Sequence, residues 1–209
     1  MTTVGFLHTA QVHVPVFNRI GSSIDPSAKF VHEVQPGLLQ ATIDRGITDD
    51  VIQGVNASLG ELVRQGCTAI TCTCSTLGDL VEDRVVEGIK VQRIDRAAAD
   101  QLMQFDRVLV LAAITSAAEA ADKLLDRSAG KAESSGRWLV ALVPGAWSLF
   151  ESGKQARYEQ VVADFANQFT GEYDAIYLSQ ASMLGAVDLC DHDNVVTSPE
   201  PGVIRLLGK

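Results

Sequence analysis

Short apolar runs alternate with stretches of helical periodicity along most of this chain of 209 residues. Apolar side chains recur every three or four positions between residues 47 and 65, where Thr48 and Gly66 are suitable residues to begin and end a helix. We predict strands at residues 4–7, 29–34, 68–73, 89–94, 107–113, 138–143, 174–178 and 195–196. We predict helices at residues 47–65, 77–86, 95–104, 115–127, 151–169 and 181–189, a loop at 128–136 and a last helix after residue 201. Because strands separated by helices are joined by crossovers, this pattern predicts an α/β protein with parallel sheets.

Small polar clusters follow several of the predicted strands. They are His8-Thr9 and Cys74-Ser75-Thr76 in the first half of the chain, and Thr115-Ser116 and Ser179-Gln180-Ala181-Ser182 in the second half. Open parallel sheets bind their ligands at the carboxyl ends of the strands. We therefore expect two pseudo-symmetric α/β lobes, each a short parallel sheet flanked by helices, with an active-site cleft between them. The first lobe is predicted to contain residues 1–94 and 193–209, and the second residues 95–192.

The charge and hydropathy of the chain exclude several classes of partner. The net charge is −9 at pH 7, and the sequence lacks the block of Lys and Arg that is typical of proteins binding nucleic acids or anionic membranes. No apolar run reaches the about 18 residues that a membrane span requires. The first apolar stretch follows no basic residues and is interrupted by His8, so we predict no signal peptide and a cytoplasmic location.

Cysteines stand at positions 67, 72, 74 and 190, with no Cys-x-x-Cys pair among them. In a reducing cytoplasm we expect them to be free thiols. A structural zinc site usually takes two well-spaced pairs of ligands, so the spacing favours no metal site. Cys67, Cys72 and Cys190 are expected to be structural, because they lie at the start of a strand, within a strand and at the end of a helix.

Cys74 has a different position, between a predicted buried strand and a predicted helix. The unpaired N–H groups at a helix start favour an anion, so we expect a thiolate here with a pKa below the ~8.5 of a free cysteine. The same N–H groups, with the hydroxyls of Ser75 and Thr76, can hold a substrate carboxylate. A thiolate in this position suits proton abstraction beside a carboxylate or attack on an electrophilic carbon. The alternative is that Cys74 is a small buried residue without chemistry.

His8 ends the first predicted strand and also allows two interpretations. It can pair with Cys74 or act as a second proton carrier. It can equally be a structural residue that is hydrogen-bonded to the loop that follows the strand.

Four segments of the chain together resemble a known family: residues 5–9, 74–76, 110–116 and 174–183. In their order they resemble the aspartate/glutamate/hydantoin racemase superfamily, which also contains maleate isomerases and arylmalonate decarboxylases. The resemblance covers nearly the whole chain in element order. It implies a homodimeric enzyme that needs no metal, no pyridoxal phosphate and no other cofactor. Two thiols flank the α-carbon in such enzymes; one removes the proton and the other returns a proton on the opposite face.

Carried over residue by residue, the resemblance makes Cys74 the thiol of the first lobe, with Ser75 and Thr76 as carboxylate binders and Thr115 or Ser116 binding from the second lobe. The sequence departs from the family in two places. Gln180 stands where the second cysteine belongs, with Ser182 near the position of the expected histidine, and His8-Thr9 replaces the usual Asp-Ser pair. The predicted catalytic residues are Cys74 and His8. The predicted substrate-binding residues are Thr9, Ser75, Thr76, Thr115, Ser116, Gln180, Ala181 and Ser182.

Three functions follow from these residues. The first is a cofactor-independent racemase or isomerase that acts on a small carboxylate through Cys74. The second is a lyase, such as a decarboxylase, or a hydrolase with a single thiol on the same scaffold, which Gln180 favours because an amide neither gives nor takes a proton as a thiol does. The third is a protein that binds a small carboxylate without converting it.

Overall fold

A computed structural model of the protein describes residues 2–209 and confirms the predicted α/β class. The chain forms two units, one of residues up to Asp95 together with Pro199–Lys209 and the other of Arg96–Ser198. Residues 193–198, which were predicted to lie in the first lobe, are part of the second unit. The reason is that β9 (Val195–Thr197) pairs with β8 (Ala175–Leu178) in the sheet of that unit.

The first unit is built on a sheet with the strand order β2-β1-β3-β5-β4. Its strands are β1 (Thr3–His8), β2 (Lys29–Val34), β3 (Ala69–Cys72), β4 (Val85–Val86) and β5 (Ile89–Arg93). All pairings are parallel as predicted, except that β4 forms an antiparallel hairpin with β5. Because β1 and β3 are adjacent and parallel, the chain segments that follow them lie next to each other at the carboxyl ends of the strands.

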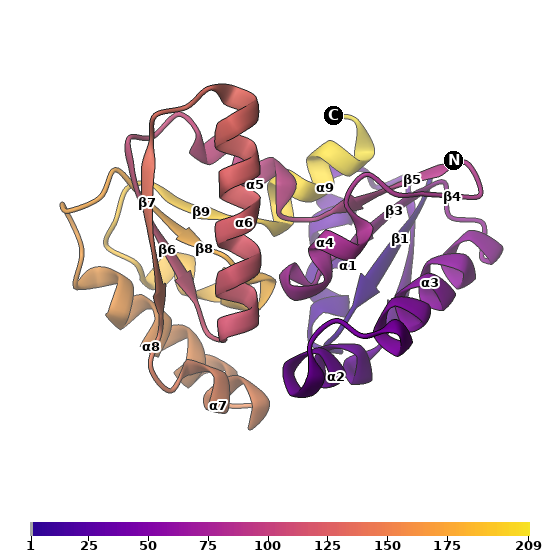
Figure 1. Cartoon of the computed structure of the whole chain (residues 1–209), viewed down its shortest axis with the longest axis horizontal. Helices are drawn as coiled ribbons and strands as arrows, with labels where there is room; N and C mark the ends of the chain where they lie inside the picture. Colours follow the sequence, from indigo (N-terminus) through magenta and orange to yellow (C-terminus); the bar gives the residue numbers. More distant parts are fainter. Residues whose placement is uncertain (1) are drawn as a thin grey trace. The chain divides into compact units, whose positions relative to one another are not determined.

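Helices cover the first sheet, and one of them comes from the far end of the sequence. They are α1 (His13–Ile24), α2 (Pro36–Arg45), α3 (Asp49–Arg64), η1 (Ser75–Leu77), α4 (Gly78–Val81) and α9 (Pro199–Leu207). The apolar face of α3 packs on the sheet, and this helix begins after Thr48 and ends before Gly66, as predicted. Helix α9, yellow in Figure 1, packs against α1 and β3.

The second unit has a parallel sheet with the order β7-β6-β8-β9. Its remaining elements are α5 (Arg96–Leu102), β6 (Arg107–Ala112), α6 (Thr115–Ala132), β7 (Arg137–Leu142), α7 (Ala146–Glu151), α8 (Gln155–Asn167) and η2 (Ala181–Leu189). Alternate side chains of β6 and β8 face α5 and α6 on one side and α7 and α8 on the other. Figure 1 shows α6 and α8 on opposite sides of this sheet.

Several predicted helices differ from the observed ones. Helix α6 continues to Ala132, through residues that were predicted to form a loop. The helix predicted at 151–169 is α8, which begins only at Gln155. Helix α7 precedes it and was not predicted, and Gly153, with a positive φ of 69°, lies between the two. The helix predicted at 77–86 is only the short η1 and α4, followed by β4. The structure adds α1 and α2, which were not predicted.

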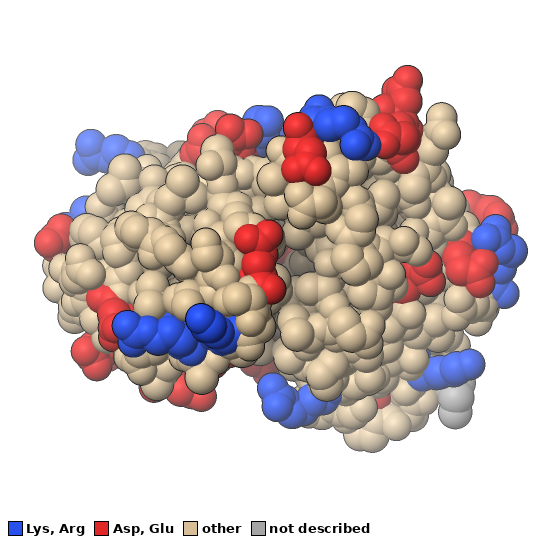
Figure 2. Space-filling view, turned by 90° about the horizontal axis from the view of Figure 1, so that it is seen from below, with Lys and Arg blue, Asp and Glu red and all other residues tan. Residues whose placement is uncertain are grey.

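Charged side chains of both signs are distributed over the surface. On the face in Figure 2, Lys and Arg side chains lie in separate groups with Asp and Glu near them. Among the helices of residues 2–209, none is both long and apolar enough to cross a membrane.

Candidate active site

The carboxyl ends of β1 and β3 bring two of the predicted site residues together. Leu7 of β1 is paired with Cys72 of β3, and the N–H of Thr73 donates to the carbonyl of Leu7 at 2.9 Å. The residues that follow these strands, Thr9 and Cys74, therefore lie at the same edge of the sheet, and the Thr9 hydroxyl is hydrogen-bonded to the Cys74 thiol. This is the edge at which open parallel sheets bind ligands.

Opposing effects act on the pKa of the Cys74 thiol. Burial is the largest and raises the pKa, because Cys74 is only 9% exposed and a thiolate loses its hydration there. The Thr9 hydroxyl and the backbone N–H groups of Leu77 and Thr76 lower the pKa by hydrogen bonding to the sulfur, and the charge of Asp95 raises it. The net result is a raised pKa, so the predicted lowering was wrong. The raised pKa favours the thiol over the thiolate near neutral pH.

The expected helix start after Cys74 is present in a weaker form. Cys74 has extended backbone angles, and the chain then turns through η1 into the four-residue α4. Ser75 and Thr76 are buried within this turn. The Leu77 N–H donates to the Cys74 carbonyl at 3.2 Å, and the N–H groups of Leu77 and Thr76 also lower the pKa of the nearby sulfur. So short a helix adds little dipole to the field of these donors.

His8 is turned to partners other than Cys74. Its Nδ1 lies 2.8 Å from the Thr73 hydroxyl and its Nε2 lies 2.9 Å from Nδ1 of His32. The Nε2 of His32 lies 3.0 Å from the Asn18 Oδ1. Since this oxygen can only accept, we assign protons to Nε2 of both His32 and His8. The single proton of the Thr73 hydroxyl then has two acceptors in reach, Nδ1 of His8 at 2.8 Å and the Leu7 carbonyl at 3.2 Å, and we assign it to the nearer one. Both ring nitrogens of His8 are thus engaged in a hydrogen-bonded chain.

Burial keeps this histidine cluster uncharged. His8 is fully buried, and its pKa is lowered to about 3, first by burial and then by the neighbouring His13 and His32. Burial also lowers the pKa of His13 to about 4 and that of His32. This geometry agrees with the structural alternative for His8 and leaves its predicted catalytic role without a contact to Cys74. Asn18 and His32 were not predicted as partners, because their side chains meet His8 only once α1 and β2 are placed.

A buried ion pair lies beside the same strand ends. Arg93 ends β5, and its guanidinium donates to both carboxylate oxygens of Asp95, with Nε–Oδ1 at 2.7 Å and Nη2–Oδ2 at 3.1 Å. Its Nη1 also lies 2.6 Å from Asp79 and 3.5 Å from Glu82 of the turn that follows Cys74. None of these residues was predicted to belong to a site. Asp95 alone had a signal, since it directly follows a predicted strand.

The other cysteines have structural positions, as predicted. Cys67 and Cys72 are buried in the core of the first unit, and the Cys72 thiol donates to the Cys74 carbonyl at 3.7 Å. The Cys190 thiol donates to the carbonyl of Ala186 at 3.1 Å. Burial raises the pKa of all three thiols, which disfavours their thiolates. In the described residues 2–209, no group of His, Cys, Asp and Glu is arranged to hold a metal ion.

In the second unit, the predicted residues also lie at strand ends. The Oε1 of Gln180 accepts the backbone N–H of Ala113 at 2.6 Å, and the Ser182 hydroxyl lies 2.8 Å from the hydroxyl of Tyr158. Ala181 begins η2. Thr115 and Ser116 begin α6. Gln180 therefore bridges the ends of β8 and β6, because its acceptor oxygen is held by the loop that follows β6.

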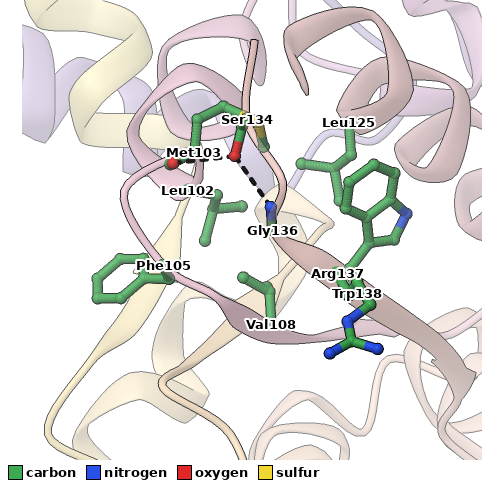
Figure 3. A pocket seen from close by; sticks show the side chains of 9 residues that line it. All are labelled: Leu102, Met103, Phe105, Val108, Leu125, Ser134, Gly136, Arg137 and Trp138. Carbon is green, nitrogen blue, oxygen red and sulfur yellow. Dashed lines mark hydrogen bonds between the residues drawn. The ribbon is translucent and has the colours of Figure 1, made fainter. Parts of the chain in front are cut away.

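Two hollows of the second unit contain none of these residues. The small one holds about 10 Å³ and is lined mainly by apolar side chains, with Leu102, Val108 and Leu125 among them. Figure 3 shows the Ser134 hydroxyl in its lining, where it donates to the Met103 carbonyl and accepts the Gly136 N–H. Its size is that of about one water molecule. The larger hollow, about 430 Å³, is open to solvent and lies around Tyr173, Asp174 and His192.

Solved structures of racemases share the fold of this chain. A Picrophilus torridus aspartate racemase matches with a TM-score of 0.76 and 14% identity, covering 100% of this chain and 94% of the other. The glutamate racemase from Aquifex pyrophilus matches with a TM-score of 0.68 and 13% identity, covering 99% and 83%. Allantoin racemase from Pseudomonas fluorescens matches with a TM-score of 0.62 and 13% identity, covering 99% and 90%. No protein-family model matches the sequence, and no curated protein is significantly similar to it. The chain has the same fold as these racemases, as the resemblance of its motifs predicted.

Proposed function

We propose that this protein is a cofactor-independent enzyme of the isomerase class that acts on a small carboxylate through the Cys74 thiol. The observation that supports the proposal most is the placement of Cys74. Its sulfur lies at the carboxyl edge of a parallel sheet, where the Thr9 hydroxyl and two backbone N–H groups donate to it. The racemases among the structural neighbours make the isomerase class the first choice.

In the proposed reaction, the Cys74 thiolate takes the proton from the carbon next to the substrate carboxylate. The S–H bond forms, the C–H bond breaks, and its electron pair enters an enediolate. The Thr9 hydroxyl and the N–H groups of Thr76 and Leu77 stabilise the thiolate before the transfer. If the S–H proton exchanges with solvent before a proton returns to the same face, the substrate gains a solvent proton without inversion. Racemisation requires a second acid on the opposite face.

A second candidate is a lyase with Cys74 as the only proton donor. Here the bond to a carboxyl group breaks, carbon dioxide leaves, the electron pair remains on the carbon, and the Cys74 S–H protonates it. Two observations favour this reaction. Burial keeps Cys74 in the thiol form, which is the acid that the step needs. Gln180, at the position of the expected second thiol, can neither give nor take a proton as a thiol does.

Solvent deuterium incorporation tests both candidates. The protein is incubated in heavy water with a panel of amino, hydroxy and dicarboxylic acids, and mass spectrometry reports exchange at the α-carbon. We expect exchange that is lost in Cys74→Ser and kept in Cys190→Ser, a matched control because Cys190 belongs to the other unit.

The remaining outcomes separate the alternatives. Release of carbon dioxide from malonate-type acids, without exchange of the other acids, would favour the lyase. If no acid is converted and Cys74→Ser binds carboxylates as tightly as the parent protein, both catalytic proposals are wrong and the protein is a binder.

A further inference from the structure

Arg93 and Asp95 form an ion pair that is withdrawn from solvent. The side chain of Arg93 is 1% exposed and that of Asp95 is 2% exposed. Two parallel N–H···O bonds join them, which is the geometry in which a guanidinium binds a carboxylate most strongly. Buried ion pairs are costly to desolvate and contribute little net stability, so this pair calls for a role other than stabilisation.

The strand register places this pair beside Cys74. In the parallel pairing of β3 with β5, Cys72 is opposite Arg93, and the N–H of Ile94 donates to the Cys72 carbonyl at 3.0 Å. Residues paired across neighbouring strands point to the same face of a sheet, so Cys72 and Arg93 are on the same face. Cys74 and Asp95 follow two residues later, just beyond the ends of these two adjoining strands. The charge of Asp95 accordingly acts on the Cys74 thiol.

Arg93 also holds the turn that donates to the sulfur. Its Nη1 is 2.6 Å from the carboxylate of Asp79 in α4. The guanidinium packs directly on the backbone at Gly78, where an added Cβ would lie 2.6 Å from its central carbon. The segment Ser75–Leu77 just before Gly78 supplies the N–H groups that reach Cys74. One side chain thus contacts both the anion beside the thiol and the turn that binds the thiolate.

We propose that the Arg93–Asp95 pair sets how readily Cys74 ionises, with Arg93 as a positioning residue that touches no substrate. Arg93 offsets the negative charge of Asp95 beside the sulfur and fixes the turn with its N–H donors. The inference rests on the proposed function only in taking Cys74 as the reacting group.

Of the titratable and charged groups around Cys74, the Arg93–Asp95 pair is the one whose substitution should change the charge beside the sulfur. Strand β3 contributes the Cys72 thiol, and the loop after β1 contributes the uncharged Thr9. The turn after Cys74 contributes Asp79 and Glu82, which are bound to Arg93 on the side away from Asp95. Helix α3 adds apolar side chains to the cluster that contains Cys74.

Opposite substitutions give opposite expectations. Asp95→Asn removes a negative charge beside the sulfur while the guanidinium remains, so the thiol should ionise at lower pH. Arg93→Met leaves the Asp95 carboxylate unpaired, so the thiol should ionise at higher pH. We expect the alkylation rate of Cys74 at a fixed pH below its pKa to rise about fivefold to tenfold in the first variant and to fall by a similar factor in the second.

The measurement is the pH profile of alkylation by iodoacetamide, followed at Cys74 by peptide mass spectrometry. The midpoint of the profile reports acidity, whereas its plateau reports access of the reagent. Cys190 is followed in the same samples as an internal control from the other unit. Arg93→Lys keeps the positive charge but loses the two parallel N–H donors of the guanidinium. The midpoint of its alkylation profile should stay near that of the parent. This variant replaces Arg93→Met if that protein does not fold.

Opposite shifts at Cys74 with an unchanged Cys190 support the proposal. Shifts in the same direction in both variants, or equal shifts of Cys74 and Cys190, would instead report a general loosening of the fold and overturn it. Because no substrate is used, the two proposals can fail separately. Opposite shifts without any exchange would contradict only the proposed function, and exchange that needs Cys74 without opposite shifts would contradict only the tuning.

Discussion

At the residue scale, the Thr9 hydroxyl is the side-chain donor to the Cys74 sulfur. Thr9→Val removes this donor with little change in shape, whereas Thr9→Ser keeps the hydroxyl. A hydrogen bond to a charged group contributes about 1.5–3 kcal/mol, so Thr9→Val should slow alkylation of Cys74 near neutral pH by about tenfold or more. Thr9→Ser should stay within about threefold of the parent. Equal rates in Thr9→Val and the parent would show that the N–H groups of the turn suffice.

Gln180 offers a second test at this scale. Its Oε1 accepts the N–H of Ala113 at 2.6 Å. Gln180→Leu leaves this N–H without its acceptor and should lower the free energy of unfolding by about 1–3 kcal/mol, measured by urea denaturation. Gln180→Glu keeps an oxygen in place and should unfold near the parent's midpoint. If Gln180 binds substrate, Gln180→Glu should also raise KM for an acidic substrate, because its carboxylate repels another.

The sequence predicted that Thr9 and Cys74 lie together at the strand ends, but not the charges and burial around them. Thr9 and Cys74 were predicted as site residues because each follows a strand, and the parallel sheet brings strand ends together. The direction of the Cys74 pKa shift was wrong, because burial depends on packing that the sequence does not display. Arg93 was missed for a related reason. A charged residue near the end of a strand looks solvated until its buried partners are known.

At the element scale, the histidines on β1, β2 and α1 make stability depend on pH. The pKa of His8 is lowered to about 3 and that of His13 to about 4 in the folded protein. The unfolded chain, with an ordinary histidine pKa near 6.5, binds protons more readily, so stability is full above about pH 6.5 and is lost as pH falls below it. Urea midpoints at pH 7.5, 6 and 5 should therefore decrease in this order.

A pair of variants isolates the contribution of His8. His8→Gln cannot titrate in this range and should give a smaller loss of stability between pH 7.5 and 5, whatever its stability at pH 7.5. His192→Gln, in the other unit, should keep the dependence of the parent. A dependence in His8→Gln as steep as that of the parent would assign the acid sensitivity to other groups.

The elements that the sequence predicted well are those with regular patterns. Helix α3 has the predicted course, because its apolar stripe is visible without tertiary contacts. Helix α1 was missed, since its buried stripe consists of His13, Phe17 and Gly21, of which only one is a typical core residue. The split between α7 and α8 depends on the positive φ of a single glycine, Gly153.

At the scale of the whole molecule, the chain completes its first unit with its last residues. The parallel sheets and the two-unit organisation were predicted, but the return point was placed at residue 193 and lies at Pro199. The strand β9 explains the difference, because its pairing with β8 is decided by neighbours and not by its own three residues. From Pro199 the chain belongs to the first unit again, because α9 packs against α1 and β3.

Gly202 allows α9 to pack closely on the first unit. Substituting it should lower stability, whereas the same substitution at Gly130 should raise it. A Cβ at Gly202 of α9 would collide with the carbonyl oxygen of Ile94, next to Asp95, whereas a Cβ at Gly130 of α6 meets nothing within 4 Å. Gly202→Ala should lower the free energy of unfolding by about 1–3 kcal/mol, because backbone must move. Gly130→Ala should raise it by about 0.5–1 kcal/mol, because alanine favours a helix interior. Urea denaturation measures both changes, and a Gly202→Ala protein as stable as the parent would show that α9 does not pack against Ile94.

Because Ile94 lies between Arg93 and Asp95, we also expect Gly202→Ala to shift the alkylation profile of Cys74, while Gly130→Ala should leave it unchanged.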